Sequence, residues 1–268
     1  MNILSGETFS FLKRLPVCAL AEWFFVFTIC LVFVSCSKTK DNRTVVLTEK
    51  SKDGYMITVE IYPPDAPNPP CVILVHRYGG DRSVWRQVAV LLQQRGIMAA
   101  ALDLRGHGES VRKGGERVNY RQLPEDSWLG ALQDIGVARD LLLNQGADPK
   151  NIIIAGEGLG ANLALHYALE DTAMQGVIMI SAGLEYNGVA AEGFIQKLVD
   201  CPTLLMASEG DAYAATSASA LNQAAPVFSE LRTWSGSAHG VDIFVAHPEA
   251  IEFMLEWLTP IFKGNAAQ

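Results

Sequence analysis

Apolar runs of four to six residues alternate with longer amphipathic stretches through the middle of this chain. Residues 72–75, 97–102 and 152–155 are the runs, and helical patterns follow them at 83–95, 128–144 and 161–169. Strands that are apolar on both faces belong to parallel sheets covered by helices. The alternation therefore predicts an α/β domain.

Further elements are predicted on both sides of this alternation. Residues 45–48 and 56–62 indicate a hairpin around Asp53 and Gly54, and a proline-rich loop follows at 63–70. The later elements are strands at 176–180, 203–207 and 228–234 and a closing helix at 248–258. Only about twenty residues separate the sixth and seventh strands. We therefore expect no large lid.

The second helical pattern has the clearest apolar stripe. Its members are Leu132, Ile135, Ala138, Leu141 and Leu142. They repeat at the spacing of one helix face, which is typical of a helix that packs on a core. We interpret this stripe as core and not as a cofactor site.

The N-terminal region has the pattern of an export signal. Lys13 and Arg14 precede an apolar run at 23–34, which ends just before Cys36 and a polar stretch. This pattern resembles a bacterial lipoprotein signal, in which cleavage precedes the cysteine and a diacylglycerol is attached to its thiol. We expect a signal peptide over 1–35, a tether over 36–44, the main domain over 45–262 and a tail over 263–268.

An uncleaved membrane anchor over residues 15–34 is the alternative, although Pro16 and Glu22 interrupt that stretch. Both interpretations place the domain in the bacterial cell envelope, outside the cytoplasm. Ser37 follows Cys36 where aspartate is associated with inner-membrane retention, which favours the outer membrane in a double-membraned cell.

Length, composition and charge narrow the class of protein. The chain has 268 residues, 49% of them hydrophobic, which is enough for one domain with a large core. Its formal net charge is −8, and the main domain has no run of lysine and arginine. Nucleic acid and anionic membrane surfaces attract basic patches, so neither is expected as the main partner. The oligomeric state is left open.

The pentapeptide at 156–160, Gly-Glu-Gly-Leu-Gly, has the frame of a nucleophile elbow, G-x-S-x-G, with no nucleophile in it. An elbow is a sharp turn from strand to helix that holds its central residue in a strained conformation. Gly158 stands where the serine would be. Glycine can adopt this turn without strain, but it has no side chain with which to attack a substrate.

Four other motifs accompany this frame. They are His76 to Ser83 after one strand, Asp103 to Ser110 after the next, Glu209-Gly210-Asp211, and Ala238-His239-Gly240. In this order the five motifs resemble the α/β-hydrolase superfamily, most of all its compact, dienelactone-hydrolase-like and esterase-like bacterial members. The resemblance covers roughly residues 45–262. It implies a mostly parallel sheet of about eight strands, flanked by helices, with a short cap.

The resemblance also implies roles for single residues. Asp211 matches the catalytic acid, with Glu209 as a rival, and His239 matches the base. The N–H of Leu159 and that of Arg77 or Tyr78 match the oxyanion hole. The nucleophile position, Gly158, is vacant.

The remaining histidines are expected to have no part in the chemistry. His76 is interpreted as part of the oxyanion loop and His107 as part of a turn motif. His166 and His247 are given no role.

Arg77 stands where many relatives have glycine. We expect its guanidinium either to narrow the pocket or to attract a carboxylate. Glu157 is expected to point away from the vacant position, and Ser181 is not expected to replace the nucleophile. No metal site or cofactor is expected, because the histidines and carboxylates lack the spacing of known metal motifs.

The two cysteines of the main domain are expected to be buried and unpaired. In the sheet of the family, Cys71 and Cys201 lie three strands apart, which is ~14 Å at about 4.8 Å per strand. A disulfide spans at most about 7 Å between Cα atoms.

Three interpretations of the missing serine are open. The first is a catalytically silenced lipoprotein that binds a small molecule or an envelope protein. The second is an active hydrolase of an ester, thioester or small amide, in which His239 and Asp211 act with water or an unusual nucleophile. The third is a sequencing error or a recent mutation, because serine and glycine codons can differ by one base.

Overall fold

A computed structural model describes residues 43–226 and 228–265 of the chain. The predicted signal peptide, Cys36 and most of the tether lie outside these residues. The described residues form one compact unit. None of the helices in the described part is long and apolar enough to cross a membrane.

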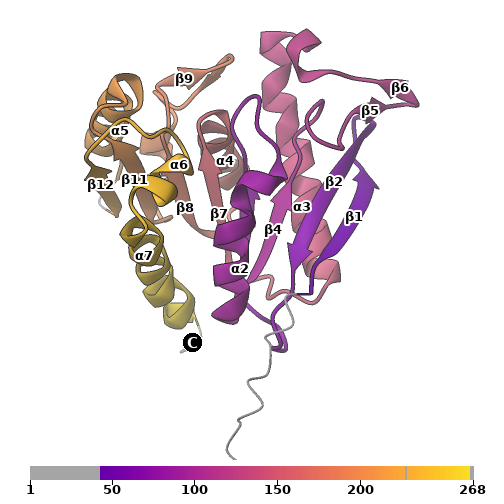
Figure 1. The fold of residues 1–268 in the computed structure, drawn as a ribbon, viewed down its shortest axis with the longest axis horizontal. Helices are drawn as coiled ribbons and strands as arrows, with labels where there is room; N and C mark the ends of the chain where they lie inside the picture. The colour runs from indigo at the N-terminus through magenta and orange to yellow at the C-terminus, as the bar shows by residue number, and fades with distance from the viewer. Residues whose placement is uncertain (1–42, 227, 266–268) are drawn as a thin grey trace, which may run out of the picture. The chain divides into compact units, whose positions relative to one another are not determined.

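One mixed sheet runs through this unit (Figure 1). Its eight longer strands are β1 (Val45–Lys50), β2 (Tyr55–Tyr62), β3 (Cys71–Val75), β4 (Met98–Leu102), β7 (Ile152–Glu157), β8 (Met174–Ile180), β11 (Thr203–Ser208) and β12 (Ser229–Trp234). Two short strands, β5 (Arg112–Lys113) and β6 (Glu116–Arg117), extend it to ten among the described residues.

The strand order is β12-β11-β8-β7-β3-β4-β2-β5-β6, and β1 pairs with β2. All neighbours from β12 to β4 are parallel, whereas β2 is antiparallel to β1, β4 and β5. The prediction of a mostly parallel sheet of about eight strands is confirmed for the longer strands. The two short strands were not predicted, because two residues carry no detectable periodicity.

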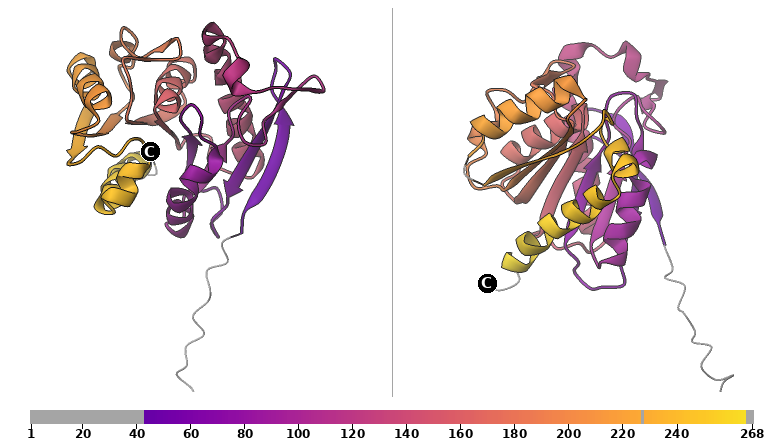
Figure 2. Two further views of the ribbon diagram at one scale, coloured as in Figure 1. Left: turned by 45° about the horizontal axis from the view of Figure 1, so that its top comes forward. Right: turned by 60° about the vertical axis from the view of Figure 1, so that its left-hand side comes forward.

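Helices cover both faces of the sheet (Figure 2). Within residues 43–226 and 228–265, the α-helices are α2 (Arg86–Gln94), α3 (Leu132–Asn144), α4 (Leu159–Glu170), α5 (Ala212–Ala224), α6 (Asp242–Ala246) and α7 (Glu249–Asn265). Short 3-10 helices are η2 (Arg82–Trp85), η3 (Tyr120–Gln122), η4 (Glu125–Ala131) and η5 (Ile195–Lys197). Helix α5 was not predicted, because it is rich in alanine and serine and has little contrast between its faces.

Each sheet face has its own core. Ile73 and Val75 of β3 belong to the core shared with α3, α4 and α5. Val72 and Leu74 of the same strand belong to the core shared with α2, α6 and α7. Strands buried on both faces need apolar residues at every position, which accounts for the uninterrupted runs in the sequence. The apolar stripe predicted on α3 is buried in the first core, as expected.

The cap over the C-terminal ends of the strands is small. Between β8 and β11 it consists of a hairpin of β9 (Glu185–Tyr186) and β10 (Val189–Ala190), followed by η5. The absence of a large lid in this part of the chain agrees with the prediction.

The prediction that the two cysteines are unpaired is confirmed, but the prediction that both are buried is wrong for Cys201. Cys71 and Cys201 are free, and the strands β3 and β11, at whose N-terminal ends they lie, are three positions apart in the sheet. Cys71 is buried, but Cys201 is partly exposed, because it precedes β11 in a loop.

Candidate active site

The turn between β7 and α4 has the geometry of a nucleophile elbow. Gly158 joins the strand to the helix with φ 54° and ψ −121°, a conformation that strains any residue with a side chain. The flanking glycines allow the strand and helix to approach closely. A Cβ at Gly156 would lie 2.1 Å from the carbonyl oxygen of Gly160, and one at Gly160 would lie 2.4 Å from that of Val75.

His239 and Asp211 meet beside this turn. Asp211 follows β11, and His239 lies in the loop after β12, so both come from the same end of the sheet as Gly158. The Nδ1 atom of His239 lies 2.6 Å from Oδ2 of Asp211. Because a carboxylate only accepts, Nδ1 carries the proton and Nε2 keeps a free lone pair. The structure pairs Asp211 with His239, whereas the rival Glu209 is exposed.

The free nitrogen of this pair is directed at the vacant position. A Cβ built on Gly158 would lie 3.5 Å from His239 Nε2. A serine hydroxyl attached to that Cβ can come within hydrogen-bonding reach of the imidazole, as a nucleophile and its base require. Asp211, His239 and the vacant position therefore have the arrangement that the predicted roles of acid, base and nucleophile require, without the hydroxyl.

Two buried side chains hold the loop that carries His239. The Gly240 N–H donates to Ser181 Oγ (2.8 Å), and the Val241 N–H donates to Glu157 Oε2 (2.9 Å). Both side chains are fully buried at the ends of neighbouring strands. Ser181 thus supports the histidine loop, and Glu157 points toward that loop and not toward the vacant position.

Arg77 forms an ion pair with Glu157, with Nη1 2.8 Å from Oε2, and its Nη2 lies 3.7 Å from Asp242. The carboxylate that Arg77 attracts therefore belongs to the protein itself. The side chain also borders the elbow, because a Cβ at Gly158 would lie 3.0 Å from Arg77 Cβ. Arg77, in the loop after β3, therefore borders the elbow and is joined through Glu157 to the loop that carries His239.

The loop after β3 supplies one candidate oxyanion donor. The Arg77 N–H faces Glu157 Oε1 at 3.4 Å, a long contact. The N–H groups of Tyr78 and of Leu159, at the start of α4, make no hydrogen bond to any other described residue. The N–H groups of Tyr78 and Leu159 are therefore free to act as oxyanion donors, and the role of all three N–H groups in an oxyanion hole stays a prediction.

Two neutral histidines, His76 and His107, hold the loop after β3 in place. The Leu104 N–H donates to His76 Nε2 (3.0 Å), and His76 Nδ1 donates to the Arg77 carbonyl (2.7 Å). The Gly79 N–H donates to His107 Nε2 (3.0 Å). Burial lowers the pKa of His76 to about 4 and that of His107 to about 3. Both imidazoles accept a backbone hydrogen bond, which requires the neutral form.

Aromatic side chains surround the site. Tyr186, in the cap hairpin, has its ring centre 6.5 Å from that of His239 and 5.5 Å from that of Tyr213. On the side of the oxyanion loop, Tyr78 packs edge-on against Tyr120 and Trp128. Burial, with Asp211 nearby, raises the pKa of Tyr186 to about 12. Sequence motifs predicted Tyr78 but did not identify Tyr120, Tyr186 and Tyr213, because these three come from separate elements, η3, β9 and α5, that carry no motif.

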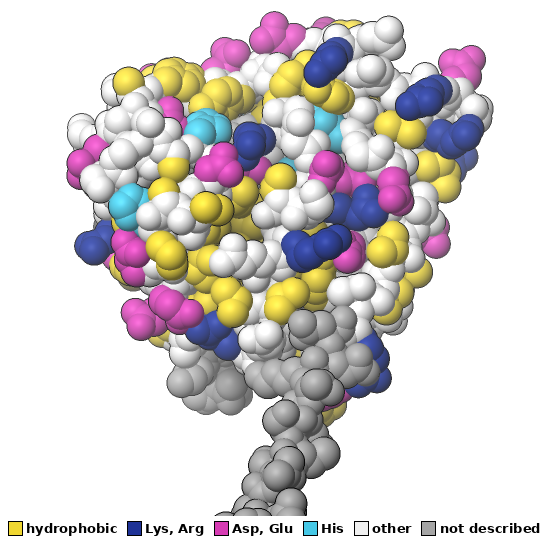
Figure 3. All heavy atoms as spheres, in the orientation of Figure 1, with side chains coloured by type: hydrophobic (Ala, Val, Ile, Leu, Met, Phe, Trp, Pro, Cys, Tyr) yellow, Lys and Arg dark blue, Asp and Glu magenta, His cyan; other side chains and the backbone are white. Residues whose placement is uncertain are grey.

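The other two histidines lie away from the vacant position. His166 Nε2 contacts the Ala190 carbonyl, and His247 bridges the Ser235 carbonyl and Glu249. Within the described residues, no group of three His, Cys, Asp or Glu side chains could hold a metal ion. In the orientation of Figure 3, acidic and basic side chains are intermixed over the visible face, and histidines reach the surface among them.

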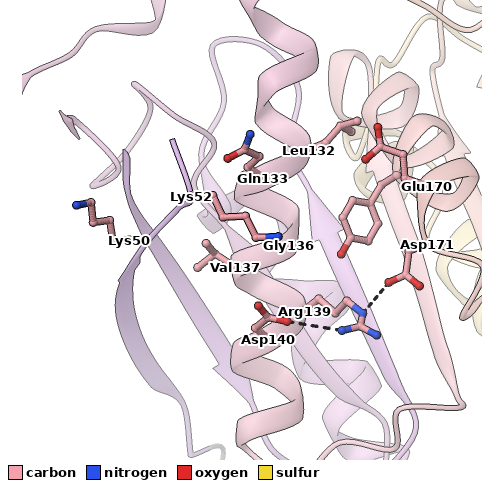
Figure 4. Close-up of a pocket in the computed structure, with 11 residues that line it drawn as sticks. Lys50, Lys52, Leu132, Gln133, Gly136, Val137, Arg139, Asp140, Glu170 and Asp171 are labelled. Carbon is pink, nitrogen blue, oxygen red and sulfur yellow. Dashed lines mark ion pairs between the residues drawn. The ribbon is translucent and has the colours of Figure 1, made fainter. Parts of the chain in front are cut away.

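A pocket of about 360 Å³ lies elsewhere, between α3, α4 and the β1–β2 hairpin (Figure 4). It adjoins the C-terminal end of α4, whereas the elbow lies at the N-terminal end of this helix, about 18 Å away along its axis. Arg139 in this pocket is paired with Asp171 (2.7 Å) and lies 3.6 Å from Asp140. None of the predicted site residues lines this pocket.

The fold and the site together define an α/β-hydrolase. The family model described as serine aminopeptidase, S33, matches residues 66–200, about half of the chain, and the chain belongs to this family. The superfamily predicted from the five motifs is therefore confirmed.

Individual relatives agree with this assignment. The chain is 36% identical over 72 residues to a monoacylglycerol lipase of Mycolicibacterium smegmatis, which is 27% of this chain and 25% of the relative. It is 27% identical over 186 residues to a putative α/β-hydrolase of Acanthamoeba polyphaga mimivirus, covering 63% of this chain and 66% of the relative. The alignments thus span less than two thirds of these relatives.

Solved structures show the same fold. The dienelactone hydrolase of Anabaena variabilis matches with a TM-score of 0.62 at 18% identity, over 83% of this chain and 97% of the other.

Proposed function

We propose that this protein is a catalytically silent α/β-hydrolase that binds a small molecule, or a partner in the cell envelope, at the site around Gly158. The observation that carries the proposal is the backbone of residue 158. It has the strained geometry of an elbow, with His239 Nε2 directed at it, and a glycine in place of the nucleophile. Removal of one member of a triad typically leaves only ~10³ to 10⁴ of rate enhancement over water.

Ester hydrolysis and fluorophosphonate labelling test this proposal. The parent protein is expected to remain unlabelled and to hydrolyse p-nitrophenyl acetate no faster than its His239→Ala variant. His247→Gln serves as the matched control, because His247 lies away from the elbow and pairs with Glu249. Turnover by the parent that disappears in His239→Ala and persists in His247→Gln would refute silencing.

An active hydrolase is the second candidate, and the intact His239–Asp211 pair favours it. In this alternative a water molecule near the vacant position gives a proton to Nε2 and attacks an ester, thioester or amide carbonyl. The N–H groups of Tyr78 and Leu159 would stabilise the oxyanion. Homology to a lipase is compatible with either candidate.

Attachment to the cell envelope through a lipid on Cys36 is part of the proposal. It is supported by the sequence pattern around Cys36 alone. Labelling of growing cells with a radioactive fatty acid should mark the parent and not a Cys36→Ala variant. Equal labelling of the two would refute the lipid anchor.

A further inference from the structure

The last strand of the sheet, β12, has an open edge. Among the described residues it pairs with β11 alone, and it is the outermost strand on one side of the sheet in Figure 1. The Phe228 carbonyl accepts a hydrogen bond from the Thr203 N–H (3.0 Å), so the even-numbered residues along β12 bond toward β11. The odd-numbered ones, Ser229, Leu231 and Thr233, therefore direct their N–H and C=O groups away from the sheet. Such an edge can pair with a strand of another chain.

Two opposite charges lie in the middle of this edge. Glu230 and Arg232 are exposed, and neither forms an ion pair with another residue in the described part of the chain. They lie two residues apart and therefore on one face of the strand, where the Arg232 guanidinium also lies over the ring of Phe253 in α7. Charges on an edge strand usually prevent pairing. Here one of each sign makes the strand complementary to an antiparallel copy of itself.

One antiparallel register satisfies the backbone and the charges together. It places Leu231 of the two copies opposite each other at a two-fold axis, and Ser229 of each copy opposite Thr233 of the other. The outward N–H and C=O groups then bond to one another. Glu230 of each copy lies opposite Arg232 of the other, in the pairs whose side chains approach most closely. Registers centred on Glu230 or on Arg232 would instead place like charges opposite each other.

The same register covers an exposed aromatic side chain. Phe228, directly before β12, is 66% exposed and lines a hollow of about 470 Å³ with Trp257 and Ile261 of α7. In this register Phe228 lies opposite Trp234 of the second copy. Trp234 packs edge-on against Phe253, with the ring centres 5.9 Å apart, on the face that also carries the two charges. An exposed apolar group beside an open strand edge favours a protein partner.

We propose that two copies of this protein associate through β12, antiparallel and centred on Leu231, so that their sheets continue into one. The second copy is the partner because this edge complements itself in hydrogen bonding and in charge, as a two-fold contact between identical surfaces requires. The inference does not depend on the chemistry at Gly158 and holds equally for a silent and for an active protein.

Sedimentation equilibrium of the full chain, in a detergent matched to the density of the buffer, tests the association. The parent should sediment as a dimer. Glu230→Lys should weaken association at least about tenfold, because both attractive pairs become repulsive. Addition of Arg232→Glu to this variant should restore it, because opposite charges face each other again. The control Glu49→Lys makes the same change at an exposed position of β1, which pairs with β2 alone, and should leave association unchanged.

Disulfide formation tests the register. A mixture of the Glu230→Cys and Arg232→Cys variants should form a mixed disulfide on oxidation, because Cα atoms in such pairs are about 4.5 Å apart, within the range of a disulfide. The mixed dimer also keeps one ion pair between Glu230 and Arg232. Each variant alone should cross-link far less, because its new thiol is not opposite itself.

Three results would overturn the inference. The first is a parent that stays monomeric up to about 100 μM, well above the dissociation constants of specific interfaces of ordinary size. The second is a double charge reversal that does not regain association, or a Glu49→Lys control that loses as much as Glu230→Lys. The third is a mixture of cysteine variants that cross-links no more than either variant alone.

Discussion

Replacement of Gly158 by serine should destabilise the protein and at the same time restore a nucleophile. The residue has φ 54°, a conformation that costs a non-glycine residue about 1–3 kcal/mol. The new Cβ would also lie 3.0 Å from Arg77 Cβ, so one of the two must move by a few tenths of an ångström. For a domain of this size, about 1–3 kcal/mol corresponds to a fall in Tm of roughly 2–12 °C.

The gain in activity follows from the distance to the base. The Cβ of the introduced serine would lie 3.5 Å from His239 Nε2, which allows the hydroxyl to donate to it. Deletion of the serine from an intact triad costs on the order of 10⁶ in kcat. If even a small part of this is recovered, the variant should hydrolyse p-nitrophenyl acetate at least about 10³-fold faster than the parent and should react with a fluorophosphonate.

Gly158→Ala is the matched control, because alanine introduces the same Cβ without the hydroxyl. It should lower Tm about as much as Gly158→Ser does and should gain neither turnover nor labelling. Thermal unfolding and the ester assay on all three proteins decide the question. An unchanged or higher Tm in both variants would mean that this turn is not an elbow. A serine variant that is destabilised but inactive would mean that His239 and the oxyanion donors are not arranged for catalysis.

Three further predictions concern the groups that hold the site together. Arg77→Met should lower the free energy of unfolding by about 1–3 kcal/mol in a urea titration, because it leaves the buried Glu157 without its cation. The partial exposure of Arg77 weakens the ion pair and keeps the expected loss at this moderate size. The control Arg95→Met breaks an exposed pair with Glu252 and should cost less than about 1 kcal/mol; equal effects would contradict the reasoning. Ser181→Ala should lower the free energy of unfolding by about 1–3 kcal/mol in a urea titration, because the buried Gly240 N–H loses its acceptor. An unchanged free energy of unfolding would contradict this role of Ser181. In the folded protein the pKa of His76 is about 4 and that of His107 is about 3, below the unfolded value of about 6.5. The unfolded state therefore binds more protons below that pH, and each histidine should remove about 2 kcal/mol of stability as the pH falls from 7 to 5. Urea titrations at the two pH values should show a smaller loss of stability for His76→Gln than for the parent, and an equal loss would contradict the reasoning.

The sequence by itself determined the fold and the central defect of the site. Short runs that are apolar at every position favour strands covered on both faces, and the five motifs in order indicate which loops follow which strands. The vacant nucleophile position could also be recognised from the sequence, because an elbow requires a particular residue at a fixed place in a short local motif.

Only the tertiary structure decided how the loops meet. It paired His239 with Asp211 and not with Glu209, and it directed the Arg77 N–H toward Glu157, which leaves that of Tyr78 available. It also joined Ser181 to the histidine loop. These contacts connect segments that lie about 28 to 80 residues apart in the chain, and they depend on distances between loop ends at one edge of the sheet. Local periodicity carries no information about such distances, which are set by strand order and by packing.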